Sequence, residues 1–514
     1  MALFEVGKQF PPQKYVKRLA ENKRMKRLFQ GRQAEMFERA TEILKDSPNA
    51  QQLRQLYIAV NLADILVTKP ADLLVGEPPQ YESGLSDKSE EQKRLNSYVE
   101  ENDLNQLIHE SCTANGYRGD AWIKVRYGYR QDYTEVKNVL SPEEYDAYMA
   151  NVDMEPIIEH VKADSVFVET ARGNVKKFKA INITSIEWLE TRKDEVPYLN
   201  VERHVPGFII YERYRLIQKG VDEQWFAPVP IFEIAERVQT GRELDVVATN
   251  LPHMPVFHIP YKSVDDDWRG ISGLSKLESV FAAINDRLVQ IDYILWKHSD
   301  PNSYGPELEG VGDGVKFGGV YIPVTKDDVT PGYMVWQAQL DAAFKQLDFL
   351  IGVVFQMSET PQWLFGTTMS GDNSGGTGTS HSDGAAIRAR FMPILSKIKR
   401  IRSHYDKAIR DALWTCALYD AEFGDYEGEA VYPVIKWNDG IPKNEKEEAE
   451  IMQIRTSGKP TIDVRSAIKK QDEVDDEKAE EIMKRIEDDE TTSMGTVDSS
   501  IFNQTTPTTE EATE

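Results

Sequence analysis

Apolar residues recur every three or four positions in three stretches of the second half of the chain, the spacing of a helix with one buried face. The first stretch runs from about 274 to 298, and the second from about 336 to 358. The third begins near Ala385, and we expect Pro393 either to kink it or to mark a later start of the helix. The pattern therefore predicts three amphipathic helices.

The segment between the first two helices, residues 299–333, is rich in glycine and proline. Within it, VKFGGVYIPV predicts a short strand or hairpin. At the start of the first helix, Ser275 and Glu278 have the spacing of a capping box, which satisfies orphan amides at a helix start. We therefore expect a helix, a small connecting segment and a second helix that runs back in the opposite direction.

Residues 95–270 show a different pattern, with many β-branched and aromatic residues in short runs. Turn residues such as Arg172-Gly173-Asn174 separate some of these runs. The runs are AWIKVRYGY, SVFVETA, KFKAINITSIEWLE, FIIYERYRLI, EQWFAPVPIFEIAERV and MPVFHIPY. They predict the antiparallel strands of an α+β domain.

The two ends of the chain differ in charge. Residues 14–59 are expected to be helical, and their first half is basic: Lys14, Lys17, Arg18, Lys23, Arg24, Lys26, Arg27 and Arg32. This cluster is either a solvated helix face or a contact for a neighbouring subunit or a phosphate. Residues from Asn444 to about Ile486 also predict charged helices, whereas the composition after Arg485 predicts disorder.

Residues 360–384, between the second and third helices, are rich in glycine and serine and have almost no charge. Loops longer than about 12–15 residues are uncommon inside a domain and are usually functional or disordered. This one begins with Trp363-Leu364-Phe365, an apolar anchor that we expect to pack against a helix as buried core. The alternative for the anchor is a platform on which DNA bases stack.

The composition narrows the class of protein. The 514 residues are 40% hydrophobic and 28% charged, as in soluble globular proteins, and no run of about 18 apolar residues predicts a membrane span. The N-terminus has no apolar core typical of a secretory signal. Two cysteines, Cys112 and Cys416, indicate a reducing cytosol, although a bridge between them stays open. The formal charge of −24 argues against a stable grip on DNA and allows only weak or transient contact.

No catalytic motif is complete. Gly371-Asp372-Asn373-Ser374-Gly375-Gly376 differs by one inserted asparagine from the sequence around a trypsin-like nucleophile, and the insertion disrupts the oxyanion-hole geometry. Neither a phosphate-binding loop nor the ligand spacing of a zinc site occurs. The acidic run 265–267 has the residues of a cation site but is more typical of a solvated turn. We expect no catalytic residue, no metal and no cofactor, and a hydrolase using Ser374 is the enzymatic alternative.

Four segments, in this order and spacing, resemble the SPP1-type portal proteins of tailed bacteriophages: 61–79, 114–125, 255–278 and 442–485. The first ends in a Gly-Glu-Pro turn, the second is similar to a helix-to-strand step, and the fourth is an acidic helical segment. The third resembles the family's last body strand and the start of its first stem helix. It departs from the family pattern at Pro260-Tyr261, which replaces an Asn, and by two extra residues before the stem helix.

The resemblance covers most of residues 50–487 and implies a multi-domain α+β portal fold. Its parts would be an N-terminal helical segment (1–59), a wing (60–273), a two-helix stem (274–298 and 334–359), a small α/β clip (299–333), a tunnel loop (360–384), a long helix and return strand of the wing (385–442), a helical crown (443–487) and a disordered acidic tail (488–514). In this family the subunits form a dodecameric ring at one capsid vertex. The ring is a channel through which double-stranded DNA enters during packaging and leaves during ejection.

The resemblance also implies partners: the large terminase subunit, a head-completion or adaptor protein, and the major capsid and scaffolding proteins. The protein would be made in the cytoplasm of the host bacterium and would end in the virion, with no membrane contact. Residues expected to face the tunnel or DNA are Gln362, Trp363, Asp372, Asn373, Ser374, Thr377, Ser380 and His381. Residues expected to dock the motor on the clip are Glu307, Glu309, Lys316 and Phe317.

The third helix has a basic face, and Arg388, Arg390 and Lys397 on it are candidates either for sparse contacts with DNA or for pairing with a neighbouring subunit. Two amphipathic helices suit lateral packing in a ring, but they equally suit a helical hairpin in a monomer. The alternative function is therefore an acidic scaffold or adaptor that binds only protein and has no DNA channel.

Overall fold

The computed structural model describes residues 3–33, 60–190, 195–223, 227–298, 303–306, 321–324, 330–333, 340–365, 384–438, 445–458, 460–472, 474 and 476–495. The described residues form a mixed α+β architecture, as the sequence predicts. Its helices are α1 (Gln13–Phe29), α4 (Leu62–Val75), α5 (Glu90–Glu101), α6 (Leu104–Arg118), α7 (Thr134–Val139), α8 (Pro142–Met149), α9 (Glu278–His298), α10 (Leu340–Met357), α11 (Gly384–Phe423), α12 (Glu445–Thr456), α13 (Val464–Gln471) and α14 (Asp476–Gly495). Its strands are β1 (Gln9–Phe10), β2 (Gln80–Glu82), β3 (Asp120–Gly128), β4 (Glu155–Val161), β5 (Val166–Ala171), β6 (Asn174–Glu190), β7 (Glu195–Val205), β8 (Phe208–Asp222), β9 (Val229–Val238), β10 (Val246–Ala248), β11 (Val256–Pro260), β12 (Ser303–Pro306), β13 (Tyr321–Val324), β14 (Gly332–Tyr333) and β15 (Val434–Lys436).

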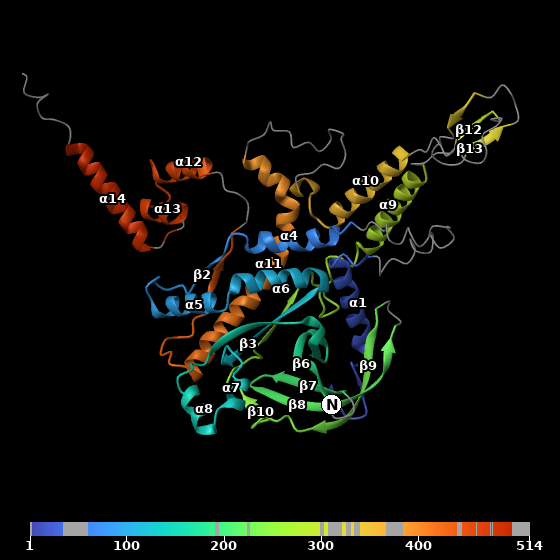
Figure 1. Ribbon diagram of the computed structural model, residues 1–514. Coiled ribbons are helices and arrows are strands. Elements are labelled where there is room, and N and C mark those ends of the chain that lie inside the picture. The colour runs from blue at the N-terminus through green and yellow to red at the C-terminus, as the bar shows by residue number, and fades with distance from the viewer. Residues whose placement is uncertain are drawn as a thin grey trace, which may run out of the picture.

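The larger sheet has the strand order β1-β9-β8-β7-β6-β5, with β10 paired to β8. Its described pairings are antiparallel, as expected from the runs of β-branched and aromatic residues. Alternate residues of β7, including Leu199 and Val201, point to one face and are buried there with Phe10 and Tyr15. The start of α1 therefore covers this face of the sheet, and Figure 1 shows α1 beside β9.

The smaller sheet, β11-β3-β4, packs against the long helix α11. The apolar positions of α11 at helical spacing form the centre of this core, and α4, α5 and α6 complete it: Ile394, Ile398, Ile401, Tyr405, Ile409 and Leu413. Full burial of one such aliphatic side chain contributes roughly 2 kcal/mol. The helix predicted from Ala385 is confirmed, and it continues without interruption past Pro393.

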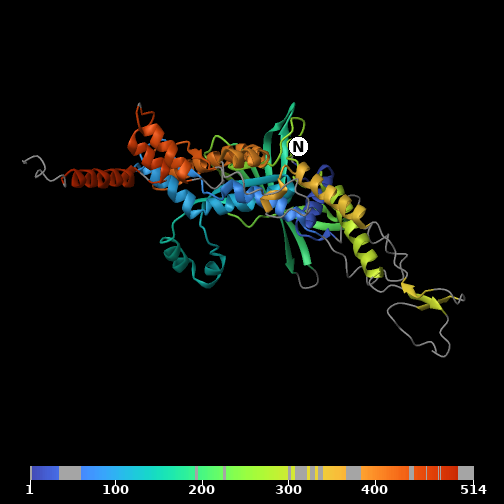
Figure 2. The same cartoon turned by 90° about the horizontal axis from the view of Figure 1, so that it is seen from above.

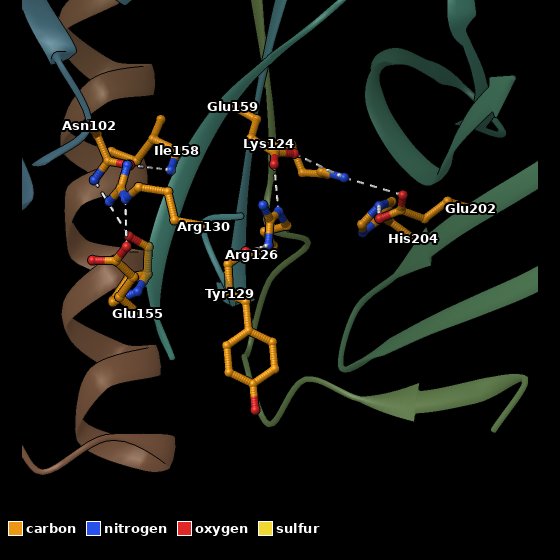
Figure 3. A network of polar contacts seen from close by, with 11 residues as sticks. Asn102, Lys124, Arg126, Tyr129, Arg130, Glu155, Ile158, Glu159, Glu202 and His204 are labelled. Atoms are coloured by element: carbon orange, nitrogen blue, oxygen red, sulfur yellow. Dashed lines mark hydrogen bonds and ion pairs between the residues drawn. The ribbon is translucent and has the colours of Figure 1, made fainter. Parts of the chain in front are cut away.

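A polar network links the two sheets (Figure 3). Lys124 Nζ of β3 lies 3.4 Å from Glu159 Oε2 of β4 and 3.3 Å from Glu202 Oε2 of β7. His204 Nε2 lies 2.9 Å from Glu202 Oε1. Burial raises the pKa of Glu202, but the contacts with His204 and Lys124 outweigh burial and lower it to about 2. The network therefore keeps a largely buried carboxylate ionised between the sheets.

The helical hairpin formed by α9 and α10 projects from the body, and a small sheet lies at its far end (Figures 1 and 2). In that sheet β12 pairs in parallel with β13 and antiparallel with β14. The root of the hairpin is fixed by a core in which Phe281 and Ile284 of α9 and Ile351 and Val354 of α10 pack with α1, α4 and α6. Figure 2 shows the small sheet and α14 at opposite ends of the molecule.

The start of α9 corrects the sequence prediction. The helix begins at Glu278, and the capping box expected from Ser275 is absent. Ser275 Oγ instead donates a hydrogen bond to the carbonyl oxygen of Ser272 at 3.1 Å, and the Glu278 carboxylate pairs with Arg24 of α1. A contact between residues far apart in the sequence therefore replaces the local motif. The predicted end of this helix near His298 is confirmed.

Other boundaries also differ. Strands β4 and β7 and the short helices α7 and α8 lie in the predicted strand region without having been expected. Helix α14 extends to Gly495, so the predicted change to a disordered tail at 488 is wrong. Both cysteines are buried free thiols, which excludes the bridge that the sequence left open. Of the run VKFGGVYIPV, β13 confirms the strand at its end, and its first six residues lie outside the described part, as do residues 34–59.

Candidate functional site

The end of α10 and the start of α11 form the root of the predicted loop. Helix α10 ends in a Schellman motif, because the Thr360 amide donates to the Phe355 carbonyl at 3.1 Å and the Glu359 amide donates to the Gln356 carbonyl at 3.2 Å. Glu359 occupies the position that usually holds glycine, with a φ of 56°. A side chain in this left-handed conformation costs of order 1 kcal/mol. The turn out of α10 is therefore sharp and strained.

Lys397 of α11 holds this turn from the other side of the loop. Its Nζ donates to the Ser358 carbonyl oxygen at 3.0 Å and lies 3.4 Å from Thr360 Oγ1. The Lys397 side chain is buried, and burial lowers its pKa from 10.5 to about 8. A buried ammonium that bonds to the last carbonyls of a helix ties the two flanks of the loop together.

Arg400, one turn further along α11, forms an ion pair with Glu359. This pair is about half exposed, so it contributes at most about 1 kcal/mol. The ion pair nevertheless matters, because it involves Glu359, the residue of the turn with a left-handed backbone. Lys397 and Arg400 thus make two contacts between α11 and the end of α10. We call Ser358, Glu359, Thr360, Lys397 and Arg400 the loop-root clasp.

The apolar anchor of the loop packs against helices as predicted, but it is not the buried core that the sequence led us to expect. Gln362–Phe365 forms a single 3₁₀ turn. The Trp363 ring meets the Phe391 ring of α11 edge-on with centroids 4.7 Å apart, and the Phe365 ring lies 5.7 Å from that of Phe355 of α10. Leu364 packs against the core around α11, whereas Phe365 packs against the core of the hairpin. The anchor therefore joins both cores, although its side chains, Gln362 and Trp363 included, are only partly buried.

The remaining predicted loop and clip residues cannot be placed in the same way. Asp372, Asn373, Ser374, Thr377, Ser380 and His381 lie outside the described residues, and so do Glu307, Glu309, Lys316 and Phe317. Arg388 belongs to α11, and Arg390 is exposed on the same helix. Lys397 corrects the prediction of an exposed basic face, because its ammonium is directed into the loop-root clasp. Lys397 follows Ile394 by three positions and precedes Ile401 by four, so its spacing already placed it on the buried stripe.

The hairpin leaves several large apolar side chains exposed. Phe349 of α10 is 70% exposed, and the same helix and α9 expose others: Phe344, Met357 and Leu295. The apolar stripe predicted for the second helix is confirmed at Leu347, Ile351 and Val354, which are buried, but not at Phe344. Large apolar side chains exposed on a projecting element offer surface that a neighbouring molecule can cover.

Metal-binding clusters and membrane-spanning helices are absent from the described residues. Within them, no group of three or more His, Cys, Asp or Glu side chains is placed to hold a metal ion. Asp267, from the acidic run 265–267, instead binds Arg269, with Oδ2 2.8 Å from Nε. None of the helices in the described part of the chain is both long enough and apolar enough to span a membrane.

The sequence pattern did not predict the loop-root clasp. Glu359 has no local signal for a left-handed backbone, and its partner Arg400 was part of a basic face with no assigned contact. The only usable signal was the position of Lys397 among apolar neighbours.

Comparison with known proteins agrees with the architecture. No curated protein matches the chain. The sequence model of the family described as "Phage portal protein, SPP1 Gp6-like" matches residues 12–492, nearly the whole chain. This match includes the smaller sheet, the larger sheet except β1, the projecting hairpin, the loop root and the C-terminal helices up to residue 492. The chain therefore belongs to the SPP1 Gp6-like family of phage portal proteins.

Proposed function

We propose that this chain is one subunit of a ring that encloses a channel for double-stranded DNA in a phage capsid. Membership of the portal family implies a ring oligomer and a structural, non-enzymatic component of the virion. In our proposal α9 and α10 are the stem, the sheet β12–β14 belongs to the clip, and residues 360–384 form the tunnel loop. The two sheets with α11 are the wing, and α12–α14 are the crown.

The observation that supports this proposal best is the projecting hairpin with its exposed apolar side chains. In a monomer, Phe349 and its neighbours would stay in water, whereas a closed ring places a neighbouring hairpin beside each one. Each large apolar side chain covered in this way contributes roughly 1.5–3 kcal/mol to association. The small sheet at the tip remains outside this contact, where it would dock the terminase motor and later the head-completion proteins.

The net charge supports a channel through which DNA slides rather than a site that binds DNA tightly. With a formal charge of −24, the subunit as a whole repels phosphate, so the duplex would release few counterions on entry and would slide. We propose that the tunnel loop, fixed at its root by the clasp, supplies sparse polar contacts to the moving DNA. Arg390, exposed on α11 beyond the loop, is the described basic residue best placed for such a contact or for a neighbouring subunit.

The proposal is tested by mass measurement of the assembled full chain, with Phe349→Ser and Val139→Ser as a matched pair. Val139 is 80% exposed on α7, away from the hairpin, so its variant controls for the loss of an exposed apolar residue. We expect a ring for the wild type and for V139S, and a concentration for assembly at least about tenfold higher for F349S.

A wild-type chain that stays monomeric or dimeric at every salt concentration would contradict the ring and favour a protein-binding adaptor. Assembly of all three proteins at the same concentration would show that Phe349 does not lie in the subunit interface.

A further inference from the structure

A surface cavity of about 280 Å³ lies beside the start of α1. Four cationic side chains line it, together with the rings of Tyr15 and Trp268: Lys14, Lys17, Arg18 and Arg269. Such a concentration of positive charge stands out in a chain whose formal charge is −24. The portal function proposed above does not use it.

Arg18 is buried in this cavity wall with most of its hydrogen-bonding capacity unused. Only 3% of its surface is exposed, and its Nη2 donates to the Val166 carbonyl oxygen at 2.7 Å. Its Nε and Nη1 atoms find no hydrogen-bond acceptor among the described residues. Buried N–H groups of this kind are costly to leave without a partner, so their presence points to a ligand.

The aromatic rings shape the site around this guanidinium. The Arg18 Cζ atom lies 5.0 Å from the centre of the Tyr15 ring and 5.4 Å from that of Trp268. At the exposed rim, Lys14 Nζ lies 4.9 Å from the Tyr15 ring centre. These contacts hold the guanidinium in place without using its donors.

The nearby carboxylates are already paired, two of them with cations that line the cavity. Glu21 lies 3.8 Å from Lys17 Nζ and 3.8 Å from Arg269 Nη1. Asp267 lines the cavity but accepts bonds from Arg269 Nε at 2.8 Å and from the Arg269 amide at 3.1 Å. Asp120 accepts bonds from His258 Nε2 and from the Gly270 amide, both at 2.7 Å.

Asp164, the other carboxylate that acts on Arg18, accepts a bond from Asn22 Nδ2 at 2.7 Å. Burial lowers the pKa of Arg18, and these carboxylates oppose the effect only at a distance. Nε and Nη1 of Arg18 thus keep unused hydrogen-bond donors, although both atoms are covered in this structure.

We infer that this cavity binds a phosphate-type oxyanion, with Arg18 at its base and Lys14, Lys17 and Arg269 around it. Guanidinium N–H groups donate charge-assisted hydrogen bonds to phosphate oxygens, and the surrounding ammonium groups favour an anion with two negative charges. The first turn of α1 adds the positive end of a helix dipole. The size of the cavity suits a phosphate and the group attached to it. The phosphate belongs either to a small phosphate ester or to a DNA backbone.

The test is calorimetric titration of the full-length protein with inorganic phosphate, with chloride holding the ionic strength constant. Lys14→Glu is the main variant, because Lys14 is exposed and its replacement leaves the fold intact. Lys26→Glu is the matched control: it makes the same charge change on the same helix at an exposed residue that does not line the cavity.

We expect saturable binding to the wild type, an affinity reduced at least about tenfold in K14E, and a change within about twofold in K26E. Absence of saturable binding, or an equal loss in both variants, would overturn the inference. Arg18→Met should abolish binding, with circular dichroism checking its fold, and unchanged binding in a folded R18M would also overturn it.

A short DNA duplex added as competitor distinguishes the sources of the phosphate. Displacement of phosphate from the wild type, with weaker competition in K14E, identifies the DNA backbone as the source. Failure of the duplex to displace bound phosphate identifies a small phosphate ester.

Discussion

Two buried cations, in the loop-root clasp and in the α1 cavity, are held in opposite ways. Lys397 directs its ammonium at the Ser358 carbonyl and Thr360 hydroxyl at the end of α10, so its hydrogen bonds stay inside the molecule. Arg18 uses one nitrogen on Val166, and two others have no acceptor among the described residues. Lys397 therefore fixes a turn, whereas Arg18 keeps donors for a ligand. In the sequence both residues belong to groups of basic residues.

The titration of Lys397 gives the largest expected effect. Its pKa falls from 10.5 in the unfolded chain to about 8 in the folded one, so the unfolded chain binds more protons between these values. The wild type should therefore gain about 3 kcal/mol of unfolding free energy relative to Lys397→Met as the pH rises from about 8 to 10.5. Urea unfolding across this range measures the difference.

Lys399→Met, at an exposed position of the same helix, controls for the loss of a lysine from α11. If the difference in unfolding free energy between wild type and K397M stayed constant across this pH range, Lys397 would not be buried as an ammonium. The contrast with Arg18 would then not hold.

Glu202 offers the same test for a partnered carboxylate, and here too the free energy of unfolding rises with pH, because the folded pKa lies below the unfolded one. Its folded pKa of about 2 lies below the ordinary 4.5, so its contribution is present above about 4.5 and is lost as the pH falls toward 2. We expect Glu202→Gln to lose about 2 kcal/mol of unfolding free energy near neutral pH, and the loss to vanish in acid. Acid and urea unfolding measure it.

Glu187→Gln is the control for this measurement, because Glu187 pairs with Arg213 at a more exposed position of the same sheet. A loss in E202Q that is the same at every pH would mean that packing, not ionisation, gives Glu202 its role.

Glu359 tests how much of the loop-root clasp is backbone strain, with the smallest expected effect. Glu359→Gly keeps the left-handed turn and removes its cost, so we expect a gain of up to about 1 kcal/mol despite the lost ion pair with Arg400. Glu359→Ala keeps the strain and loses the ion pair, and should lose about 0.5 kcal/mol. Thermal unfolding compares the two variants.

Arg400→Ala removes the ion pair alone and serves as the reference for both. Equal stability of E359G and E359A would show that the turn is not strained at this residue.

The sequence predicted the elements whose signal is local and missed those that depend on distant contacts. The stripes of α9 and α11, and that of α10 except at Phe344, followed from helical periodicity, and most strands of both sheets followed from runs of β-branched and aromatic residues. The capping box failed because Arg24, from another part of the chain, takes the Glu278 carboxylate. The burial of Arg18 depends on β5, whose Val166 carbonyl it reaches, and no pattern within α1 reports that contact.

The candidate site was predicted in part. The length and composition of residues 360–384 predicted a loop, most of which lies outside the described residues, and the predicted contact of its anchor with a helix is confirmed where Trp363 packs on Phe391. The clasp beneath it was not predicted, since a left-handed Glu359 and a buried Lys397 result from the meeting of α10 and α11. Contacts that form only when distant segments meet in the folded chain produce no periodic pattern in the sequence.

The central claim is that this chain closes into a ring around a DNA channel. Electron microscopy of the purified full-length protein tests it most directly. We predict closed rings with an open centre, in which the α9–α10 hairpins of neighbouring subunits lie side by side. Images of single or paired molecules without any ring, at all salt concentrations, would contradict the account.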